Sequence, residues 1–262
     1  MRGTDVKLPV WIGTSWKMTK TIAEARAYIE HIATAELPAG IQPFVIPAHT
    51  SLAAARDALP AESPVLLGAQ NAHWGPEGAG TGEVSMRMVG DAGARLVEIG
   101  HSERRQHHAE TDETVALKAR AAVDAGLMPL ICVGEPVDVH EAGEAIEFVS
   151  SQVRAALGRL SSTEVSGVLI AYEPIWAIGE HGRPATPTEV APVVSELARV
   201  AREVSGGVGC RALLYGGSVD EANAADLLLD ANTDGLFVGR AAWTPEGFLR
   251  LAAIAAEAAG VP

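Results

Sequence analysis

The sequence predicts a single-domain α/β fold, a closed barrel of eight parallel strands surrounded by helices, written (β/α)8. Short apolar runs alternate with helical segments along residues 1–262, and no linker or shift in composition divides the chain. Such alternation is typical of a parallel sheet whose faces are covered by helices. Eight strand–helix pairs within 262 residues favour a closed barrel over an open sheet.

An open, doubly wound sheet is the alternative fold for the same alternation of strands and helices. That fold usually carries a G-x-G-x-x-G pattern between its first strand and first helix. The first apolar run, residues 10–13, is followed by Thr-Ser-Trp-Lys-Met instead. The closed barrel is therefore the preferred prediction.

The strands are expected at the short apolar runs. They are residues 10–13, 44–47, 65–70, 95–99, 128–133, 168–172, 211–215 and 235–238. The helices are expected between residues that start or stop them. Pro38 and Gly40 end the first helix, Gly126 stops the fourth, and Pro187 takes a first-turn position that proline favours. The expected helices are residues 21–36, 51–59, 86–92, 114–125, 139–160, 187–204, 221–229 and 244–259.

The composition of the chain excludes several classes of protein. Hydrophobic residues make up 48% of the sequence, which indicates a folded chain rather than a disordered one. A net charge of −13 argues against a general surface for nucleic acid or for anionic membranes. An anionic substrate would therefore have to be attracted by a local site. No apolar run is long enough to span a membrane.

The cysteines and the N-terminal residues favour a cytoplasmic location. Cys132 and Cys210 lie in or beside apolar strand-like runs, so buried reduced thiols are expected rather than a disulfide. Residues 1–7 lack the hydrophobic core of a secretory signal.

Glu173 stands at the end of an expected strand. The apolar run 168–172 leads into it, and Pro174 follows at once. Proline lacks a backbone donor and stops the pairing of the strand. Glu173 is therefore expected at the mouth of the sixth strand, where a parallel barrel carries its chemistry. The next residues include Gly179 and Gly182, which suits a mobile lid.

Lys17 and His101 also follow strands, the first and the fourth. Taken alone, each has an ordinary structural explanation, Lys17 as a solvated lysine and His101 as a hydrogen-bonded structural histidine. Glu173 alone could equally cap a neighbouring helix. Because all three follow strands, a barrel brings them to one face, and this convergence favours a catalytic site.

His101 precedes an expected helix start at Ser102. The helix dipole disfavours a charged imidazole there, so a neutral ring can donate a hydrogen bond. His107 and His108 are expected on the polar surface of the same helix. Their spacing to His101 fits no metal-binding motif.

Glycine-rich turns follow the last two strands. Residues 216–218 are Gly-Gly-Ser, and Gly239 precedes Arg240. Glycine allows the backbone to approach an anion closely, and barrels often bind phosphate at these two turns. Tight turns also require glycine, so each turn alone is weak evidence. Together they predict a phosphate held by amides near Gly179, Ser218 and Gly239.

These groups predict proton transfer on a phosphorylated ketose. Glu173 removes a proton from the carbon next to a carbonyl, while His101 and Lys17 stabilise the enediolate oxygen. This chemistry calls for no metal ion and no cofactor. A non-catalytic barrel that senses a phosphorylated ligand is the alternative, and it would be expected to lack the base or the electrophile.

Three stretches resemble the triosephosphate isomerase family, and the similarity runs nearly end to end. They are residues 98–105 (EIGHSERR), 171–179 (AYEPIWAIG) and 214–219 (LYGGSV). The resemblance implies the TIM-barrel fold and isomerisation of a small phosphorylated sugar.

The roles that the resemblance implies are carried over from that well-studied family by position. Glu173 would be the base, His101 the electrophile and Lys17 an electrostatic binder of the substrate. Glu103 would orient the region around the lysine.

The same resemblance implies contacts to phosphate and to a second subunit. Gly179 and Ser218 would donate to the phosphate. The loop at residues 71–83, with Thr81 at its tip, is similar to the loop that joins the family's subunits. A homodimer is therefore implied.

The chain departs from the family's usual pattern at three places. Ser15 stands where the family usually has asparagine, and Arg240 where the phosphate turn has a second glycine. The lid segment 180–184 is one residue longer. The shorter Ser15 leaves space beside the reacting carbons, and pocket volume of this size shifts discrimination by ~1–3 kcal/mol. Arg240 either contacts the phosphate or points into solvent.

These departures set the substrate expected from the sequence. The stretches Gly-Thr-Ser-Trp-Lys-Met and Val-Gly-Arg-Ala-Ala-Trp are similar to the branch of the family that acts on L-erythrulose 1-phosphate and gives D-erythrulose 4-phosphate. That substrate is dihydroxyacetone phosphate lengthened by one carbon. The alternative is interconversion of dihydroxyacetone phosphate and D-glyceraldehyde 3-phosphate.

Overall fold

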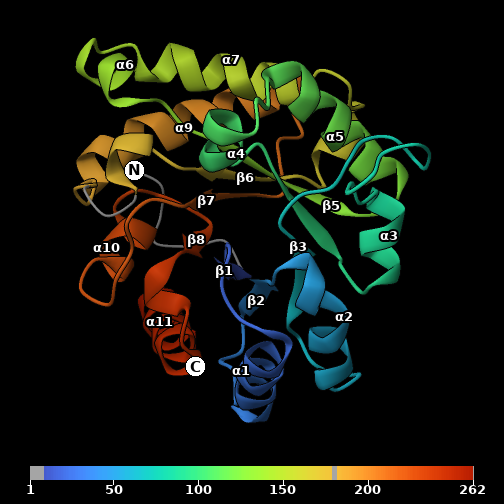
Figure 1. Ribbon diagram of the computed structural model, residues 1–262. Coiled ribbons are helices and arrows are strands. Elements are labelled where there is room, and N and C mark those ends of the chain that lie inside the picture. Colours follow the sequence, from blue (N-terminus) through green and yellow to red (C-terminus); the bar gives the residue numbers. More distant parts are fainter. Residues whose placement is uncertain (1–8, 179–181, 262) are drawn as a thin grey trace.

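The computed structural model describes residues 9–178 and 182–261, and it confirms the expected barrel. Strands β1 to β8 pair in chain order, each parallel to the next, and β8 closes onto β1. Figure 1 shows the strands at the centre and the helices arranged around them. The strands are β1 Val10–Ser15, β2 Ile41–Ile46, β3 Leu66–Ala69, β4 Leu96–Ile99, β5 Met128–Val133, β6 Leu169–Tyr172, β7 Ala212–Tyr215 and β8 Gly235–Val238.

The helices follow the strands around the outside of the barrel. They are α1 Ile22–Thr34, α2 His49–Ala58, α3 Met86–Asp91, α4 Ser102–His107, α5 Asp112–Asp124, α6 Val137–Glu141, α7 Ala145–Leu157, α8 Ser162–Val165, α9 Pro187–Val204, α10 Ala224–Leu229 and α11 Pro245–Ala258, with short 3-10 turns η1 Ile175–Ala177 and η2 Arg240–Ala242. Several begin with a cap: Thr21 accepts from the amide of Glu24, whose carboxylate in turn accepts from the amide of Thr21.

One expected helix is wrong. Residues 139–160 do not form a single helix, because α6 ends at Glu141 and α7 begins at Ala145. Gly143 between them has φ +76°, a left-handed conformation that glycine adopts at low cost and that ends a helix. The glycine in the sequence is the signal that predicts this break.

Apolar side chains fill the inside of the barrel. One buried cluster combines alternate strand residues, among them Trp11, Phe44, Leu96 and Phe237. The rings of Phe44 and Phe237 stack with centroids 5.6 Å apart. Gly13 makes room for them, since a Cβ there would lie 1.9 Å from the ring of Phe44. A larger cluster fills the space between the strands and the helices.

The alternation of side chains along each strand continues beyond this interior cluster. Residues two apart on a strand point to the same face. Glu98 lies two residues after Leu96, and Ser15 lies four after Trp11, so both belong to the inward-facing rows. Glu173 continues the row of Ala171 just past the end of β6. The inward-facing rows of side chains therefore end in polar groups at the carboxyl ends of the strands.

Two further expectations concern the cysteines and membrane-spanning segments. Cys132 is a buried thiol outside any disulfide, as expected, whereas Cys210 is only half-buried, which differs from the expectation. Within the described residues, no helix is both long enough and apolar enough to cross a bilayer.

Candidate active site

Glu173 lies directly after β6 with its side chain buried. Its amide donates to the carbonyl of Val133 at 2.7 Å, so the pairing with β5 extends to this residue before Pro174. Gly216, just after β7, approaches the side chain closely: a Cβ there would lie 2.7 Å from Cγ of Glu173. The position of the carboxylate therefore depends on the absence of a side chain at Gly216 as well as on strand β6.

His101 faces Glu173 from the end of β4. Its Nδ1 accepts a hydrogen bond from the amide of Glu103 at 3.1 Å, as the N-cap of α4. The ring proton is therefore on Nε2, which lies 3.8 Å from Oε2 of Glu173. Burial and the charge of Lys17 lower the pKa of His101 to about 4. The ring is a neutral donor that points into the site.

Lys17 reaches the same site from the end of β1. Its Nζ lies 2.6 Å from Oε1 of Glu103, so the two side chains form an ion pair. The backbone of Lys17 has φ +51°, a conformation that costs a lysine on the order of 1 kcal/mol. The amide of Gln70 donates to its carbonyl at 2.9 Å, and the neighbouring Trp16 is fully buried. Packing on both sides holds this conformation in place.

The surroundings of Glu173 favour its protonated form. Burial raises its pKa well above the ordinary value, and the nearby carboxylate of Glu98 raises it further. The charge of Lys17 and a hydrogen bond from the thiol of Cys132 act in the opposite direction. Among the described residues, Oε2 of Glu173 is buried without a hydrogen-bond partner. That oxygen therefore has no partner that would compete with a further proton or hydrogen bond.

Glu98 is a member of the site that the sequence analysis missed. Its carboxylate is buried, and Oε2 accepts a hydrogen bond from Oγ of Ser15 at 2.8 Å. Oε1 lies 3.9 Å from Nε2 of His101. The space expected beside Ser15 is thus bordered by a carboxyl group. A glutamate at an inward position of an otherwise apolar strand, Leu-Val-Glu-Ile, is the signal that predicts it.

Glu98, Cys132 and Glu173 form a compact buried group. One carboxylate oxygen from each glutamate and the sulfur of Cys132 all lie within 4.8 Å of one another. Burial and the two carboxylates raise the pKa of Cys132 well above its usual value, so the sulfur carries a proton. Metal ions bind the thiolate form, so this arrangement favours a hydrogen-bonding thiol over a metal ligand.

The residues expected to bind phosphate lie after β7 and β8. Ser218 is half-buried, and its carbonyl accepts from the side chain of Asn223 at 3.1 Å. Gly239 precedes the turn η2, and a Cβ there would meet no atom within 4 Å. Arg240 is exposed at the start of that turn. Gly179 lies outside the described residues.

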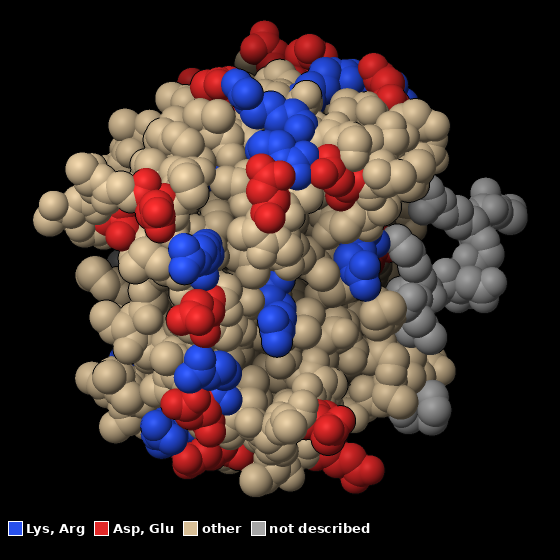
Figure 2. All heavy atoms as spheres, turned by 90° about the vertical axis from the view of Figure 1, so that its right-hand side faces the viewer, with Lys and Arg blue, Asp and Glu red and all other residues tan. Residues whose placement is uncertain are grey.

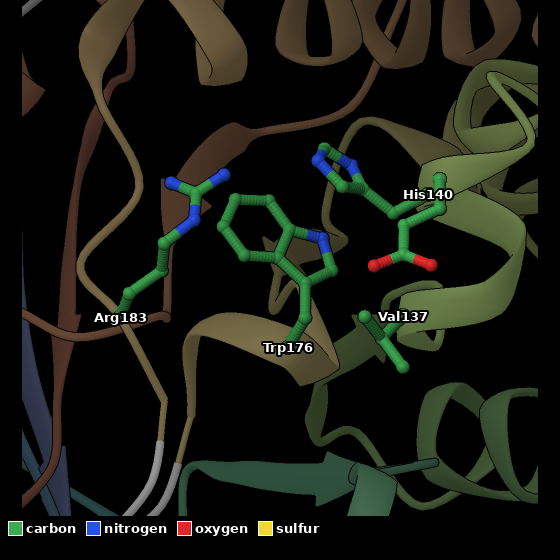
Figure 3. Close-up of a pocket in the computed structure, with 5 residues that line it drawn as sticks. Val137, His140, Trp176 and Arg183 are labelled. Carbon is green, nitrogen blue, oxygen red and sulfur yellow. The ribbon is translucent and has the colours of Figure 1, made fainter.

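Trp176 lies on the rim just after Glu173, between two side chains (Figure 3). Arg183 lies over its ring at 4.4 Å, and His140 stacks near the ring with centroids 4.2 Å apart. Its Nε1 donates to Glu135 at 2.7 Å. Trp176, Arg183 and His140, together with Val137 and Glu141, border a hollow of about 520 Å³. The hollow adjoins the turn that carries Glu173, outside the cluster of catalytic candidates.

Comparisons with known proteins agree with this arrangement. A family model described as triosephosphate isomerase matches residues 10–255. An L-erythrulose-1-phosphate isomerase from Mycolicibacterium smegmatis is 53% identical over 94% of this chain and 93% of its own length. Proteins of the same description from Rhizobium rhizogenes and Brucella abortus biovar 1 are 48% and 47% identical over 93% of this chain, covering 93% and 95% of their own lengths.

The substitution Glu98→Gln is expected to stabilise the fold more at pH 8 than at pH 5. Burial raises the pKa of Glu98 from 4.5 to about 7, so the folded state holds this proton more tightly than the unfolded state. The carboxyl therefore lowers stability as pH rises from about 4.5 to about 7, by up to about 3 kcal/mol. Urea unfolding of both proteins at each pH measures the difference.

Glu110→Gln is the matched control for this measurement. Glu110 is also buried, but its pKa is lowered by hydrogen bonds from Lys118 and Arg104 against the effect of burial. Its replacement is expected to destabilise the protein, and more so at pH 8 than at pH 5. A gain from Glu98→Gln that did not vary with pH would contradict the assignment of a raised pKa.

Proposed function

The chain belongs to the triosephosphate isomerase family, and from this premise we propose that it converts L-erythrulose 1-phosphate to D-erythrulose 4-phosphate. The observation that carries the proposal is the approach of a buried carboxylate and a neutral imidazole, with Nε2 of His101 at 3.8 Å from Oε2 of Glu173. Relatives described as L-erythrulose-1-phosphate isomerases support the choice of a four-carbon substrate.

The reaction moves a carbonyl by one carbon through an enediolate. Glu173 takes the proton from the hydroxyl-bearing carbon next to the carbonyl, and the bonding electrons move onto the carbonyl oxygen. His101 donates from Nε2 to that oxygen, and the ammonium of Lys17 stabilises its charge. Glu173 returns the proton to the former carbonyl carbon. His101 gives its Nε2 proton to the former carbonyl oxygen and takes the hydroxyl proton of the neighbouring oxygen, which becomes the new carbonyl. The electrons stay within the substrate, so no external electron acceptor takes part.

The electrostatics of the site suit each step. A carboxylate with a raised pKa is a stronger base once it is ionised. A neutral imidazole donor is a weak acid, and its hydrogen bond strengthens as charge develops on the substrate oxygen. The ion pair with Glu103 positions Lys17 without requiring it to be buried.

The phosphate of the substrate is assigned to the turns after β7 and β8. The half-buried Ser218 and Gly239 offer backbone amides, and η2 begins directly after Gly239. We assign the amide of Gly179 to the same group. Because the chain carries a net charge of −13, these local donors must supply the attraction for a phosphate.

Steady-state kinetics on both candidate substrates tests the proposal. We expect kcat/KM for L-erythrulose 1-phosphate to exceed that for dihydroxyacetone phosphate by at least ~10-fold, the discrimination that one added carbon and its hydroxyl allow. Turnover of triose phosphates near the diffusion limit, with none of the tetrulose phosphate, would assign the chain to the alternative activity. Saturable binding of a ketose phosphate without exchange of its carbon-bound hydrogen would indicate a sensor.

Glu173→Asp is expected to lower kcat by about 100-fold or more with a modest change in KM. The shorter side chain draws the carboxylate away from the carbon-bound proton, and small displacements of a base cost this much. Steady-state kinetics measures the effect, and thermal unfolding checks that the fold is intact. An unchanged kcat would mean that another residue is the base.

We also propose that the protein is a cytoplasmic homodimer joined through residues 71–83. Residues 76–83 are exposed, and the segment between β3 and α3 stands out from the barrel in Figure 1. Met18 is 97% exposed and Met88 56% exposed, which is unusual for large apolar side chains on a monomer. Figure 2 shows this side of the molecule, where charged residues are scattered among wide uncharged areas.

Thr81→Arg is expected to convert a dimer into a monomer, because it places a charge at the tip of the interlocking loop. Light scattering after gel filtration should give twice the 27.2 kDa chain mass for the parent and a single chain mass for the variant. Thr163→Arg, at an exposed position of helix α8, is the control that should remain dimeric. A monomeric parent protein would contradict the proposal.

A further inference from the structure

We infer that Glu98, held by Ser15, is the residue that selects a four-carbon substrate, by binding the hydroxyl of the terminal hydroxymethyl group. The inference rests on the proposed function and names the contact that separates the tetrulose phosphate from a triose phosphate. Glu98 would touch the substrate through Oε1, and Ser15 would act by fixing the carboxylate.

The first support is the place of Glu98 in the barrel. It is the next inward-facing residue of β4 after Leu96, which belongs to the interior cluster. Its carboxylate lies at the level of the catalytic candidates, with one oxygen within 4.8 Å of a carboxylate oxygen of Glu173 and Oε1 at 3.9 Å from Nε2 of His101. No other strand residue brings a carboxylate into this group in the described part of the chain.

The second support is the way the two oxygens of Glu98 are used. Oε2 accepts the hydrogen bond from Oγ of Ser15 at 2.8 Å, which fixes the plane and direction of the carboxylate. Among the described residues, no hydrogen bond uses Oε1, and the distance to Nε2 of His101 is too long for one. Oε1 is therefore available to a substrate hydroxyl.

The third support is the chemistry of the substrate. L-erythrulose 1-phosphate differs from dihydroxyacetone phosphate by a hydroxymethyl group on the carbon from which Glu173 takes the proton. The extra hydroxyl oxygen is thus two bonds from the carbon that Glu173 must face. A carboxylate beside both Glu173 and His101 is in reach of that hydroxyl, whereas the phosphate turns lie at the other end of the substrate.

The fourth support is the cost of this arrangement to the fold. Glu98 is only 3% exposed, and it has no lysine or arginine within ion-pair distance among the described residues. Burial raises its pKa to about 7, and its charge in turn raises the pKa of Glu173. An apolar residue would pack at this strand position at lower cost. A carboxylate retained there has a role in binding rather than in stability.

The test compares two variants of Glu98 on two substrates. Glu98→Val removes the carboxyl group and should lower kcat/KM for L-erythrulose 1-phosphate at least ~30-fold, the loss expected when a substrate hydroxyl is left unpaired in a buried site. The value for dihydroxyacetone phosphate should fall by less, because that substrate lacks the hydroxyl and is affected only through the influence of Glu98 on the basicity of Glu173. Glu98→Gln keeps an oxygen acceptor and should retain part of the activity on the tetrulose phosphate.

Two further variants complete the experiment. Ser15→Ala frees the carboxylate without removing it, so it should lower the preference for the tetrulose phosphate by less than Glu98→Val does. Glu110→Gln changes a buried carboxylate between α4 and α5 that is paired with Arg104 and Lys118, and it should leave the substrate ratio unchanged. Thermal unfolding identifies any variant that fails to fold, and Glu98→Gln then provides the comparison.

The outcomes separate this inference from the proposed function. Equal losses on both substrates would overturn it, because Glu98 would then act by tuning the basicity of Glu173 or by supporting the fold. No loss on either substrate would overturn it as well. If the parent protein does not convert L-erythrulose 1-phosphate at all, the proposed function fails and the inference fails with it.

Discussion

The constraint on which the rest of the structure depends is the two-residue alternation of side chains in a closed parallel barrel. Inward rows that begin as apolar packing end in polar groups at the carboxyl rim. Leu96 leads to Glu98, and Ala171 leads to Glu173, so the residues that fill the interior also fix the heights of the two carboxylates. A change in the packing of the interior would therefore also change the geometry of the site. A slip of one residue in any strand would turn its polar group outward.

The site concentrates unfavourable electrostatics in a small volume. Two buried carboxylates lie near each other, and a neutral histidine faces both. The two carboxylates raise the energy of charging each other, and burial together with the charge of Lys17 keeps the histidine neutral. These are the conditions for a strong base and a weakly acidic donor. The compensation comes from the charge of Lys17 and from the hydrogen bond that Ser15 donates to Glu98. The large apolar core on both sides of the sheet supplies the stability that tolerates this cost.

The sequence was sufficient for the fold class and for most of the candidate site. The proline after Glu173 and the helix start after His101 are local signals in the sequence. The closed barrel brings the two residues to the same rim. The single helix expected at residues 139–160 was wrong because the apolar spacing continues across Gly143, and the conformation of one glycine decides the break. Glu98 was missed because an apolar run was interpreted as packing alone. Its partner Ser15 is 83 positions away along the chain, and only the barrel brings the two together.

The hydrogen bond between Ser15 and Glu98 constrains how such a site can arise by mutation. A barrel that gained the glutamate first would bury a carboxylate without its donor, at a cost of about 1–3 kcal/mol. A barrel that gained the serine first would lose the larger asparagine side chain usual in the family. A gap would then be left beside the reacting carbons. Neither intermediate keeps both full stability and a well-formed site, so the two substitutions are epistatic. Changes of substrate length in this architecture are therefore expected to be inherited as pairs rather than as single residues.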